Sequence, residues 1–412
     1  MSDDVPDFSV MRMPREILFG EGQLAAIGQV AARLGARALI CTDGRFAATE
    51  AFALLLGNLQ VAGLKCHIFD AVEPDLPAEN VYRCAEMAHH FAPDLVIGVG
   101  GGSCIDLAKC AALILTYGGK LEDYYGEFKI PAPILPVIAV PTTSGTGSEV
   151  TPVAVVSDSE RTLKIGISSP YMIPAAAICD PILSWTCPPR LTAIAGADAL
   201  THAIEAFTAY RREPNADLAQ KHVFVGKNAF SDIFALKAIS LIGRSLERAC
   251  ADGSDRRARS DLMQGALAAG CAFGTAGTSL AHAVQYPIGA VTHTPHGIGV
   301  AAVLLYAMSY NRTAALAEMA EIAVALGVDR AARSIEELSH IAIGEVGRIF
   351  AAIGIPTTLQ DLGLPKDRID WTADQAAGIA RLLKNNPRPI DRDGLQKFLV
   401  AAFDGDLAAA AQ

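Results

Sequence analysis

The sequence lacks several features that define whole classes of protein. Its 412 residues contain no apolar run that approaches the ~20 residues needed to cross a bilayer, so we expect no membrane-spanning segment. No cluster of Lys and Arg is long enough to follow a phosphate backbone, and the formal net charge is −10, which disfavours nucleic-acid binding. The opening MSDDVPDFSV is acidic and has neither the basic nor the apolar region of a secretory signal. We therefore expect a cytoplasmic protein.

Pairing patterns among the cysteines are also missing. Nine cysteines are scattered along the chain with no CxxC pair, which argues against a zinc ribbon and against a redox motif. We interpret them as buried, reduced thiols. Apolar residues, by contrast, make up 51% of the chain, enough for a large core, and at about 150 residues per domain the length favours two or three domains.

Short apolar runs alternate with helical patterns through the first half of the chain. Four of them end in small or polar residues: ARALICTDG, LKCHIFDAV, PDLVIGVGGGS and LPVIAVPTTSGTGSE. Short apolar runs separated by helices predict βαβ units and a parallel sheet. Such a sheet binds ligands at the carboxyl ends of its strands. We therefore expect an α/β, Rossmann-like dinucleotide-binding domain over residues 1–188.

The pattern changes after CPPR, residues 187–190, where two prolines break the chain. Beyond them the sequence is rich in Ala and Leu at helical spacing, as in TAIAGADALTHAIEAFTAY. This predicts an all-α second domain over residues 189–412. A polar segment from Tyr210 to Asn228 interrupts the helical pattern and is expected to form a loop.

Two motifs at the ends of predicted strands suit a nucleotide. In GVGGGSCIDLAK, the turn from Gly101 to Ser103 would bring backbone N–H groups and a helix N-terminus to a diphosphate. It is not a GxGxxG fingerprint, and a purely structural turn explains it about as well. PTTSGTGSEVTP, residues 141–152, clusters hydroxyl groups that suit diphosphate and ribose oxygens, although an ordinary polar loop has the same composition. The pairing of the two motifs favours a nucleotide site.

An acidic residue ends the first of the four runs, in ICTDGRF. Asp43 is placed to accept hydrogen bonds from an adenosine ribose and to repel a 2′-phosphate. Without a cationic partner it would favour NAD over NADP. The alternative is that Asp43 and Gly44 only form a turn.

Two Ala-rich segments contain candidate metal ligands. In GADALTHAIEA, Asp198 and His202 are four residues apart and lie on one helix face. SLAHAVQYPIGAVTHTPHG contains three of the nine histidines, and His282 and His296 would complete a set of one carboxylate and three imidazoles. That set suits Fe(II) or Zn(II) and is too rich in nitrogen for calcium or magnesium. The alternatives are a solvated helix face for the first pair and a hydrogen-bonded core histidine for His282, but burying all four unpaired would be costly.

Five motifs together carry a family resemblance. GGGSCIDLAK, PTTSGTGSEVTP, GADALTHAIEA, AHAVQYPIGAVTHTPHG and KNNPRP come in the order and spacing of the iron-dependent (group III) alcohol dehydrogenases, and the chain resembles that family over almost its whole length. The resemblance implies an active site in the cleft between the two domains, NAD as cofactor, Fe(II) or alternatively Zn(II) as metal, and a homodimer or larger oligomer. The metal ligands it implies are Asp198, His202, His282 and His296. The cofactor residues it implies are Asp43, Gly101, Gly102, Ser103, Asp106, Thr142, Thr143, Ser144, Thr151 and Lys164.

Two departures from the family pattern bear on the substrate. Many members carry a histidine, assigned to proton relay, where this chain has Tyr286, and a phenol with a pKa near 10 is a poorer base. His293 is an alternative proton-relay group, or it only supports its loop. The second departure is the long loop from Tyr210 to Asn228, and both features resemble the hydroxyacid–oxoacid transhydrogenase branch. The basic residues of this loop are Arg211, Arg212, Lys221, His222 and Lys227, which would attract an anionic substrate or else form a solvated surface.

The activity expected from these features is hydride transfer between an alcohol and NAD, with the alcohol oxygen held by the metal as Lewis acid. A hydroxyacid dehydrogenase or hydroxyacid–oxoacid transhydrogenase that acts on a 4-hydroxy acid or its semialdehyde is the alternative. A metal-dependent lyase on the same architecture, like dehydroquinate synthase, fits the GADALTHA and TPHG motifs less well. A non-catalytic metal-binding module leaves the nucleotide motifs unexplained.

Overall fold

The computed structural model describes residues 8–158 and 164–412. Within these residues the chain forms two compact units. Residues 12–187 form the α/β unit, and residues 188–412, together with residues 8–11, form the helical unit.

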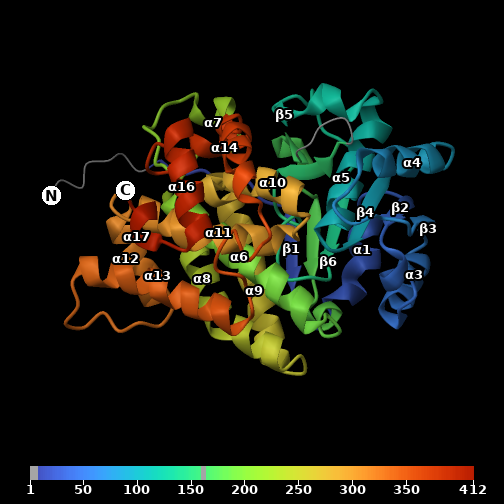
Figure 1. Ribbon diagram of the computed structural model, residues 1–412. Helices are drawn as coiled ribbons and strands as arrows, with labels where there is room; N and C mark the ends of the chain where they lie inside the picture. Colours follow the sequence, from blue (N-terminus) through green and yellow to red (C-terminus); the bar gives the residue numbers. More distant parts are fainter. Residues whose placement is uncertain (1–7, 159–163) are drawn as a thin grey trace. The chain divides into compact units, whose positions relative to one another are not determined.

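A parallel six-stranded sheet is the centre of the α/β unit, as the sequence predicts (Figure 1). Its strand order is β1-β9-β6-β4-β2-β3, and every neighbouring pair is parallel. The strands are β1 (Glu16–Phe19), β2 (Arg37–Cys41), β3 (Lys65–Phe69), β4 (Leu95–Gly100), β6 (Val137–Pro141) and β9 (Ala176–Cys179). The connecting helices are α1 (Ile27–Ala32), α2 (Gly44–Ala47), α3 (Glu50–Val61), α4 (Ala78–His89) and α5 (Gly102–Tyr117).

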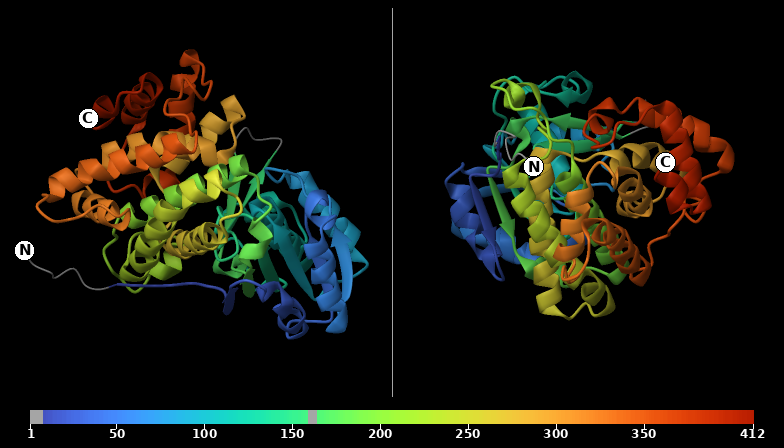
Figure 2. Two further views of the ribbon diagram at one scale, coloured as in Figure 1. Left: turned by 90° about the horizontal axis from the view of Figure 1, so that it is seen from below. Right: turned by 90° about the vertical axis from the view of Figure 1, so that its left-hand side faces the viewer.

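Helices cover both faces of this sheet (Figures 1 and 2). Along β2, Ala38 and Ile40 contribute to a core shared with α1 and α3, while Leu39 and Cys41 contribute to a core shared with α4 and α5. Successive side chains of a strand point to opposite faces, so a strand buried on both sides needs a continuous apolar run. That requirement explains the unbroken apolar runs of the sequence.

The order of the strands creates a topological switch point between β2 and β4. The chain adds β3 on the outer side of β2, and then places β4, β6 and β9 in succession on the other side. In open α/β sheets, ligands bind beyond the carboxyl ends of the strands at such a point. Asp43 follows β2 and Gly101 follows β4, so both lie at this edge of the sheet.

A second, three-stranded sheet was not predicted from the sequence. It consists of β5 (Gly126–Glu127), β8 (Lys164–Ser168) and β7 (Val153–Ser157), with β7 and β8 antiparallel. Ala154, Val156 and Ile167 attach it to the core shared with α4 and α5.

The helical unit agrees with the predicted all-α pattern. Its first helix starts at Pro189, a position where the missing N–H of proline costs nothing. The longer helices are α6 (Pro189–Thr208), α8 (Ala229–Ala251), α9 (Arg256–Ala276), α10 (Leu280–Thr292), α11 (His296–Asn311), α12 (Leu316–Ala325), α13 (Ile335–Ala352), α14 (Ile369–Ala377) and α16 (Arg392–Asp404). The short ones are α7 (Leu218–Lys221), α15 (Ala380–Leu383) and α17 (Leu407–Ala410). Across the described residues, no helix combines the length and apolar character of a bilayer span.

Helix α6 lies at the centre of the helical unit. Every residue from Gly196 to Thr208 is buried, and α6 packs against α8, α9 and α11. A helix that is buried all round requires small apolar residues on most faces, which explains its alanines. Its polar residues Asp198, His202 and Glu205 are therefore inside the unit rather than on a solvated face.

Candidate active site

Three imidazole nitrogens surround one carboxylate oxygen inside the helical unit. The Nε2 atom of His202 is 3.7 Å from Oδ1 of Asp198, and the Nε2 atoms of His282 and His296 are each 3.8 Å from the same oxygen. The donor atoms of Asp198, His282 and His296 all lie within 4.8 Å of one another. His202 lies beside this trio, with its ring stacked between those of Phe273, at 4.1 Å, and His282, at 4.7 Å. The structure thus brings together the four residues that the sequence singled out.

Two buried atoms of this cluster have unused hydrogen-bonding capacity. Among the described residues, Oδ1 of Asp198 and Nε2 of His282 have no hydrogen-bond partner. A buried carboxylate oxygen without a partner is costly, and a cation that accepts electron pairs from both atoms removes that cost. In a tetrahedral site with bonds of about 2.1 Å, ligand atoms are about 3.4 Å apart, close to the spacings seen here. The donor set therefore fits Fe(II) or Zn(II).

The opposite nitrogens of two histidines are held by polar side chains. Nδ1 of His282 lies 2.5 Å from Oε2 of Glu205, and Nδ1 of His296 lies 2.8 Å from Oε1 of Gln285. An acceptor at Nδ1 favours the tautomer with its hydrogen there and leaves Nε2 free to bind a metal. Glu205 and Gln285 thus fix both the orientation and the tautomer of two candidate ligands.

The carboxylate of Glu205 also caps the N-terminus of helix α10. Its carboxylate accepts hydrogen bonds from the backbone N–H groups of Ser279 and Ala281 and from the Ser279 hydroxyl. A carboxylate at a helix N-terminus satisfies free N–H groups and interacts favourably with the helix dipole. Burial opposes ionisation of Glu205, but the charge and hydrogen bond of His282 and these N–H donors outweigh it and lower the pKa of the carboxyl. The same side chain thus positions His282 and the helix that carries it.

Glycines let the helix that carries His296 approach its neighbours. A Cβ atom on Gly297 would collide with the backbone oxygen of Ile194 in α6. A Cβ on Gly299 would lie 2.9 Å from Cγ of Gln285, and one on Gly289 would lie 2.8 Å from its Nε2. The glycine of the TPHG motif is therefore needed for the close contact between α11 and α6.

The two proposed proton-relay residues have different surroundings. The ring of Tyr286 lies 6.0 Å from that of His296. Burial raises the pKa of the Tyr286 phenol, Asp198 and Glu205 raise it further, and a hydrogen bond and charge from Arg381 partly offset them. His293 is the exposed C-cap of α10, with a left-handed φ of 54°, and its side chain makes no hydrogen bond or ion pair to any described residue.

The two nucleotide motifs lie against each other in the α/β unit. Gly101 caps α5 without a side chain, so the N–H groups of Gly102 and Ser103 receive no side-chain acceptor. A Cβ on Gly101 would lie 3.6 Å from Oγ1 of Thr143, and one on Gly102 would lie 2.7 Å from Cγ2 of Thr146. Because the hydroxyl-rich loop packs against the turn, there is no room at Gly102 for a larger side chain. In this loop Thr142 and Thr143 are half-buried, and Ser144 is buried.

Asp43 has a cationic neighbour, which corrects the sequence interpretation. Its Oδ1 accepts from the backbone N–H groups of Arg45 and Phe46 and lies 3.4 Å from Nε of Arg45. The Arg45 side chain is 89% exposed, so most of its guanidinium faces solvent. Oδ2 of Asp43 lies 3.9 Å from where a Cβ on Gly100 would be. The carboxylate thus caps α2 and also lies beside the glycine turn. Asp43 can therefore form the local turn and still accept hydrogen bonds from an adenosine ribose.

Three of the expected cofactor residues have partners inside the α/β unit. Asp106 is buried, and its Oδ2 accepts from the backbone N–H of Val155. Thr151 is 1% exposed, and its carbonyl accepts from Nζ of the buried Lys109 at 2.9 Å. Lys164 forms an ion pair with Asp75. Asp106 therefore connects α5 to the small sheet, and Thr151 connects the hydroxyl-rich loop to α5. Both residues support the turn from inside the unit and do not lie at its surface.

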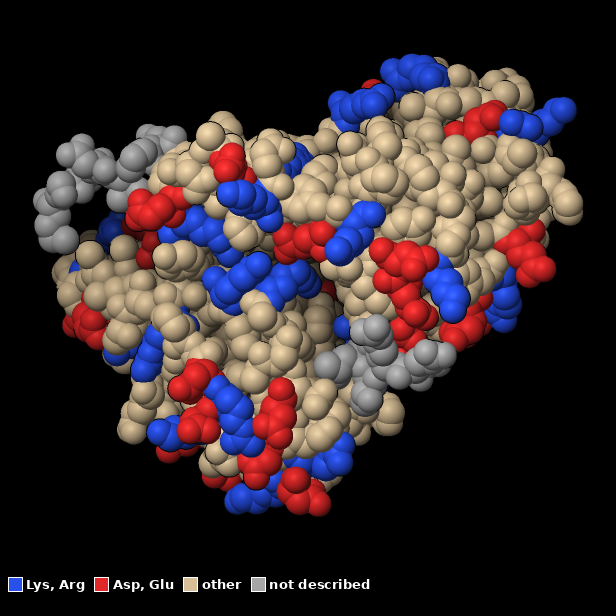
Figure 3. Space-filling view, turned by 90° about the horizontal axis from the view of Figure 1, so that it is seen from above, with Lys and Arg blue, Asp and Glu red and all other residues tan. Residues whose placement is uncertain are grey.

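The basic side chains of the loop from Tyr210 to Asn228 are largely committed to partners. Lys227 is buried, and its Nζ donates to Asp232 and to the carbonyl of Phe207, both at 2.8 Å. Arg211 lies 3.8 Å from Asp232, and Lys221 lies 2.8 Å from Asp217. Lys227 is therefore turned away from solvent, whereas Lys221 and Arg211 pair with acidic groups at exposed positions, as the solvated-surface alternative expects. Basic and acidic groups are also interspersed on the face shown in Figure 3.

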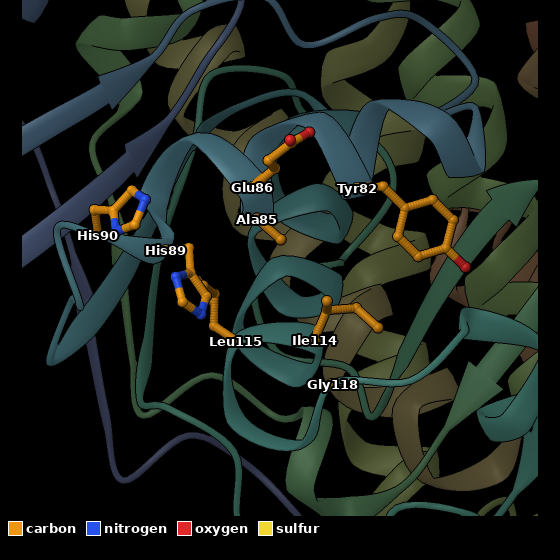
Figure 4. Close-up of a pocket in the computed structure, with 8 residues that line it drawn as sticks. All are labelled: Tyr82, Ala85, Glu86, His89, His90, Ile114, Leu115 and Gly118. Carbon is orange, nitrogen blue, oxygen red and sulfur yellow. The ribbon is translucent and has the colours of Figure 1, made fainter.

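A separate cavity of about 470 Å³ lies between the C-terminal halves of α4 and α5 (Figure 4). One face of α4 contributes Tyr82, Ala85, Glu86 and His89, and α5 contributes Ile114 and Leu115. Because a helix rises about 1.5 Å per residue, this end of α5 is roughly 18 Å from the glycine turn. The cavity is thus distinct from the nucleotide motifs.

Sequence reasoning missed four residues of these sites. Glu205 carried a usable signal, since it lies three residues after His202 on the same helix face as Asp198. Gln285 and Lys109 belong to quoted motifs, but nothing in their spacing indicates their contacts. Arg381 had no signal, because its contact with Tyr286 depends on tertiary packing.

Comparison with known proteins assigns the chain to a family. Residues 14–181 match the family described as iron-containing alcohol dehydrogenase, and residues 192–403 match the C-terminal region of the Fe-containing alcohol dehydrogenase family. Long-chain-alcohol dehydrogenase 1 of Geobacillus thermodenitrificans is 37% identical, covering 94% of this chain and 95% of the relative. The NADPH-dependent butanol dehydrogenase of Clostridium saccharobutylicum is 32% identical, covering 95% and 97%.

Solved structures agree with this assignment. A crystal structure of 1,3-propanediol oxidoreductase superposes with a TM-score of 0.89 at 32% identity, covering 96% of this chain and all of that one. Sulfoacetaldehyde reductase from Bifidobacterium kashiwanohense, in complex with NAD⁺, superposes with a TM-score of 0.81 at 27% identity, covering 96% and 98%.

The fold, the candidate site and the relatives together define the class of protein. It is an oxidoreductase that acts on CH–OH donors. The chain belongs to the iron-containing alcohol dehydrogenase family, as the sequence motifs indicate, and its function is that of an alcohol dehydrogenase.

Proposed function

We propose that the helical unit holds one divalent metal ion through Asp198, His202, His282 and His296, and that this ion is Fe(II), with Zn(II) as the alternative. The observation that carries the proposal is the unpartnered Oδ1 of Asp198 facing three Nε2 atoms at 3.7 to 3.8 Å. When bound, the ion would supply Lewis acidity toward a substrate oxygen.

The protein's own groups prepare this chemistry. Glu205 and Gln285 hold two imidazoles with Nε2 directed at Asp198. The apolar packing around α6 keeps the carboxylate and two imidazoles away from water, which strengthens electrostatic interactions there. Tyr286, beside His296, is placed to hydrogen-bond a substrate hydroxyl, and this contact favours Tyr286 over His293 in that role.

We propose that the domain predicted over residues 1–188, whose described α/β unit spans residues 12–187, binds the nicotinamide cofactor. The N–H groups of Gly102 and Ser103 and the hydroxyls of Thr142 and Thr143 are the proposed diphosphate contacts, supported by the switch point between β2 and β4. When bound, the cofactor would supply a nicotinamide ring able to take up the hydride of the carbinol carbon, and the hydroxyl proton would pass to solvent.

We propose NAD as the preferred cofactor, because Asp43 lies where an adenosine ribose would be recognised. The neighbouring Arg45 weakens this preference, since its exposed guanidinium partly neutralises Asp43. The relatives provide examples of both cofactors, because one is named as NADPH-dependent and a structure of another holds NAD⁺.

Metal analysis and turnover of a His282→Ala variant test the metal site. The variant should keep its fold, lose most of its bound metal and lose its activity with NAD and a primary alcohol. His340→Ala, which removes an exposed histidine of α13, is the control and should retain both. A His282→Ala protein with a full equivalent of metal and normal turnover would show that the cluster is not the metal site.

A further inference from the structure

The KNNPRP motif, residues 384–389, places a hydrogen-bonded amide next to the start of helix α10. Asn385 is buried, with 2% of its surface exposed. Its Nδ2 donates to the backbone carbonyls of Ala276 and Thr278, at 3.0 and 3.1 Å, and its Oδ1 accepts from Nη1 of Arg212 at 3.0 Å. A carbonyl only accepts and a guanidinium only donates, so this position requires a group that does both.

The two carbonyls belong to the short connection between α9 and α10. This connection turns at Gly277, whose φ of 86° lies in the region that favours glycine. A Cβ on Gly277 would lie 3.0 Å from Nδ2 of Asn385, so the amide packs closely against the turn. Helix α10 begins at Leu280, and its first turn carries His282. The hydrogen bonds of Asn385 thus fix the point from which that turn starts.

The same connection also holds the base of the loop from Tyr210 to Asn228. The backbone N–H of Gly226 donates to the carbonyl of Ala276 at 3.2 Å. At the other end of the loop, the N–H of Tyr210 donates to the backbone carbonyl of Asn385 at 2.8 Å. Because a buried polar network is fully satisfied in only one arrangement, these bonds specify how the three segments lie relative to one another.

Two polar side chains therefore act at successive points on the way to His282. Glu205 accepts from the backbone N–H of Ser279 and contacts Nδ1 of His282. Asn385 acts one step earlier, on the carbonyls of the connection before Ser279. Because a side chain moves with its helix, a shift in the start of α10 would move Nε2 of His282 relative to Oδ1 of Asp198, which is 3.8 Å away.

We propose that Asn385 is a positioning residue for the candidate ligand His282. By fixing the connection before α10, it holds Nε2 of His282 at the place where the proposed metal ion needs it. This rests on the proposed function and adds a residue that contacts neither the proposed metal position nor the side chain of any candidate ligand. Since metal sites need their ligands within a fraction of an ångström, losing this support should weaken metal binding.

Asn386, the next residue of the same motif, provides a matched control. It is also buried, and its side chain exchanges two hydrogen bonds with that of Asn311, at 2.7 and 2.8 Å. Asn311 is the last residue of α11 and His296 is the first, so at about 1.5 Å per residue they are roughly 22 Å apart. The two asparagines are therefore alike in burial and bonding, but only Asn385 contacts the backbone next to a candidate ligand.

The test replaces each asparagine by aspartate in the full-length protein and measures the dissociation constant for Zn(II). In Asn385→Asp, the two donated hydrogen bonds become contacts between oxygen atoms, and we expect the dissociation constant to rise about tenfold, the lower end of the range for residues that act through a ligand. Asn386→Asp should lower the unfolding temperature of the metal-free protein by a similar amount but leave the dissociation constant unchanged. Competition with a chromophoric chelator, well below the unfolding temperature, measures it. Nearly all of the protein is then folded, so a loss of stability alone does not alter metal affinity.

The visible absorption spectrum of the Co(II)-substituted protein reports ligand geometry without turnover. It should change in Asn385→Asp and match the wild type in Asn386→Asp. If Asn385→Asp does not fold, as judged by circular dichroism, Asn385→Gln and Asn386→Gln take the place of the aspartate pair, because glutamine keeps the amide but moves it by one methylene.

A folded Asn385 variant with the affinity and spectrum of the wild type would overturn the proposal. So would an equal rise in the dissociation constant for the Asn385 and Asn386 variants, because that result assigns the effect to general stability. A wild-type protein that binds Zn(II) no more tightly than His282→Ala would refute the proposed function itself. Tight binding by the wild type, lost in His282→Ala but unchanged in Asn385→Asp, would refute only the role of Asn385.

Discussion

Oε2 of Glu205 lies 2.5 Å from Nδ1 of His282, which is 77 residues further along the chain. A carboxylate at this nitrogen orients the imidazole and makes Nε2 a better electron donor. Glu205 is therefore expected to strengthen the proposed metal binding although it does not touch the proposed metal position.

Replacing Glu205 should weaken metal binding more than it weakens the fold. We expect Glu205→Gln to lower the affinity for Fe(II) or Zn(II) about 10- to 100-fold, the usual effect of losing such a partner. Competition with a chromophoric chelator measures the dissociation constant directly. Glu247→Gln, which changes an exposed carboxylate paired with Arg348, is the control. Equal affinities for the wild type and the folded Glu205→Gln protein would contradict the assignment.

A single methyl group should disturb the other histidine contact. In Gly299→Ala, the new Cβ would lie 2.9 Å from Cγ of Gln285 and displace the side chain that holds Nδ1 of His296. We expect metal affinity to fall about tenfold. Gly344→Ala is a matched control, because Gly344 lies within α13 with no atom within 4 Å of the new Cβ. That variant should be more stable by about 0.5–1 kcal/mol, with unchanged metal affinity. If both variants bind metal equally well, the Gln285 contact does not matter for the site.

Cofactor preference should respond in opposite directions to two adjacent substitutions. Asp43→Gly should lower the ratio of kcat/KM for NAD to that for NADP, because it removes repulsion of the 2′-phosphate. Arg45→Ala should raise the same ratio, because the charge of Asp43 is then no longer offset. Arg83→Ala, at an exposed ion pair elsewhere in the α/β unit, serves as control. A shift in the same direction for Asp43→Gly and Arg45→Ala would rule out this balance of charges.

The buried Glu149 should make stability depend on pH. Burial raises the pKa of its carboxyl to about 7, although its own backbone N–H and Lys109 act in the opposite direction. A carboxyl whose folded-state pKa exceeds its unfolded value of about 4.5 contributes its full stability below pH 4.5, and this contribution is lost as pH rises to 7. Glu149→Gln cannot ionise, so its melting temperature relative to the wild type should be higher at pH 8 than at pH 5. A difference that is constant across this range would mean that Glu149 is already ionised in the folded protein.

Much of the fold follows from local sequence because the central strands of the sheet are buried on both faces. The runs ending at Asp43 and Gly101 show no alternation, and this feature alone indicates a covered parallel sheet. The three-stranded sheet escaped prediction because β5 has only two residues, too few to give a sequence pattern, and because β7 directly follows the hydroxyl-rich loop and was not separated from it.

The candidate metal ligands could be predicted because the chain has only nine histidines, and because Asp198 and His202 are four residues apart on α6. Contacts that depend on packing could not be found. The position of Arg381 beside Tyr286 requires α15 to lie against α10, and no local pattern encodes that. The charge of Lys227 was misinterpreted for the same reason, since its partner Asp232 belongs to α8. Counting charges along a loop does not reveal which of them are neutralised.

The candidate ligands come from three separate helices, α6, α10 and α11. A cation held by all of them would act as a reversible cross-link between distant parts of the chain, as a disulfide does, but one that a chelator can open. Cross-links stabilise mainly by restricting the unfolded chain, and the effect grows with the length of the loop that they close. The ion would thus stabilise the helical unit in addition to its chemical role. Loss of the metal would make local unfolding of α10 and α11 easier even before any substrate is present.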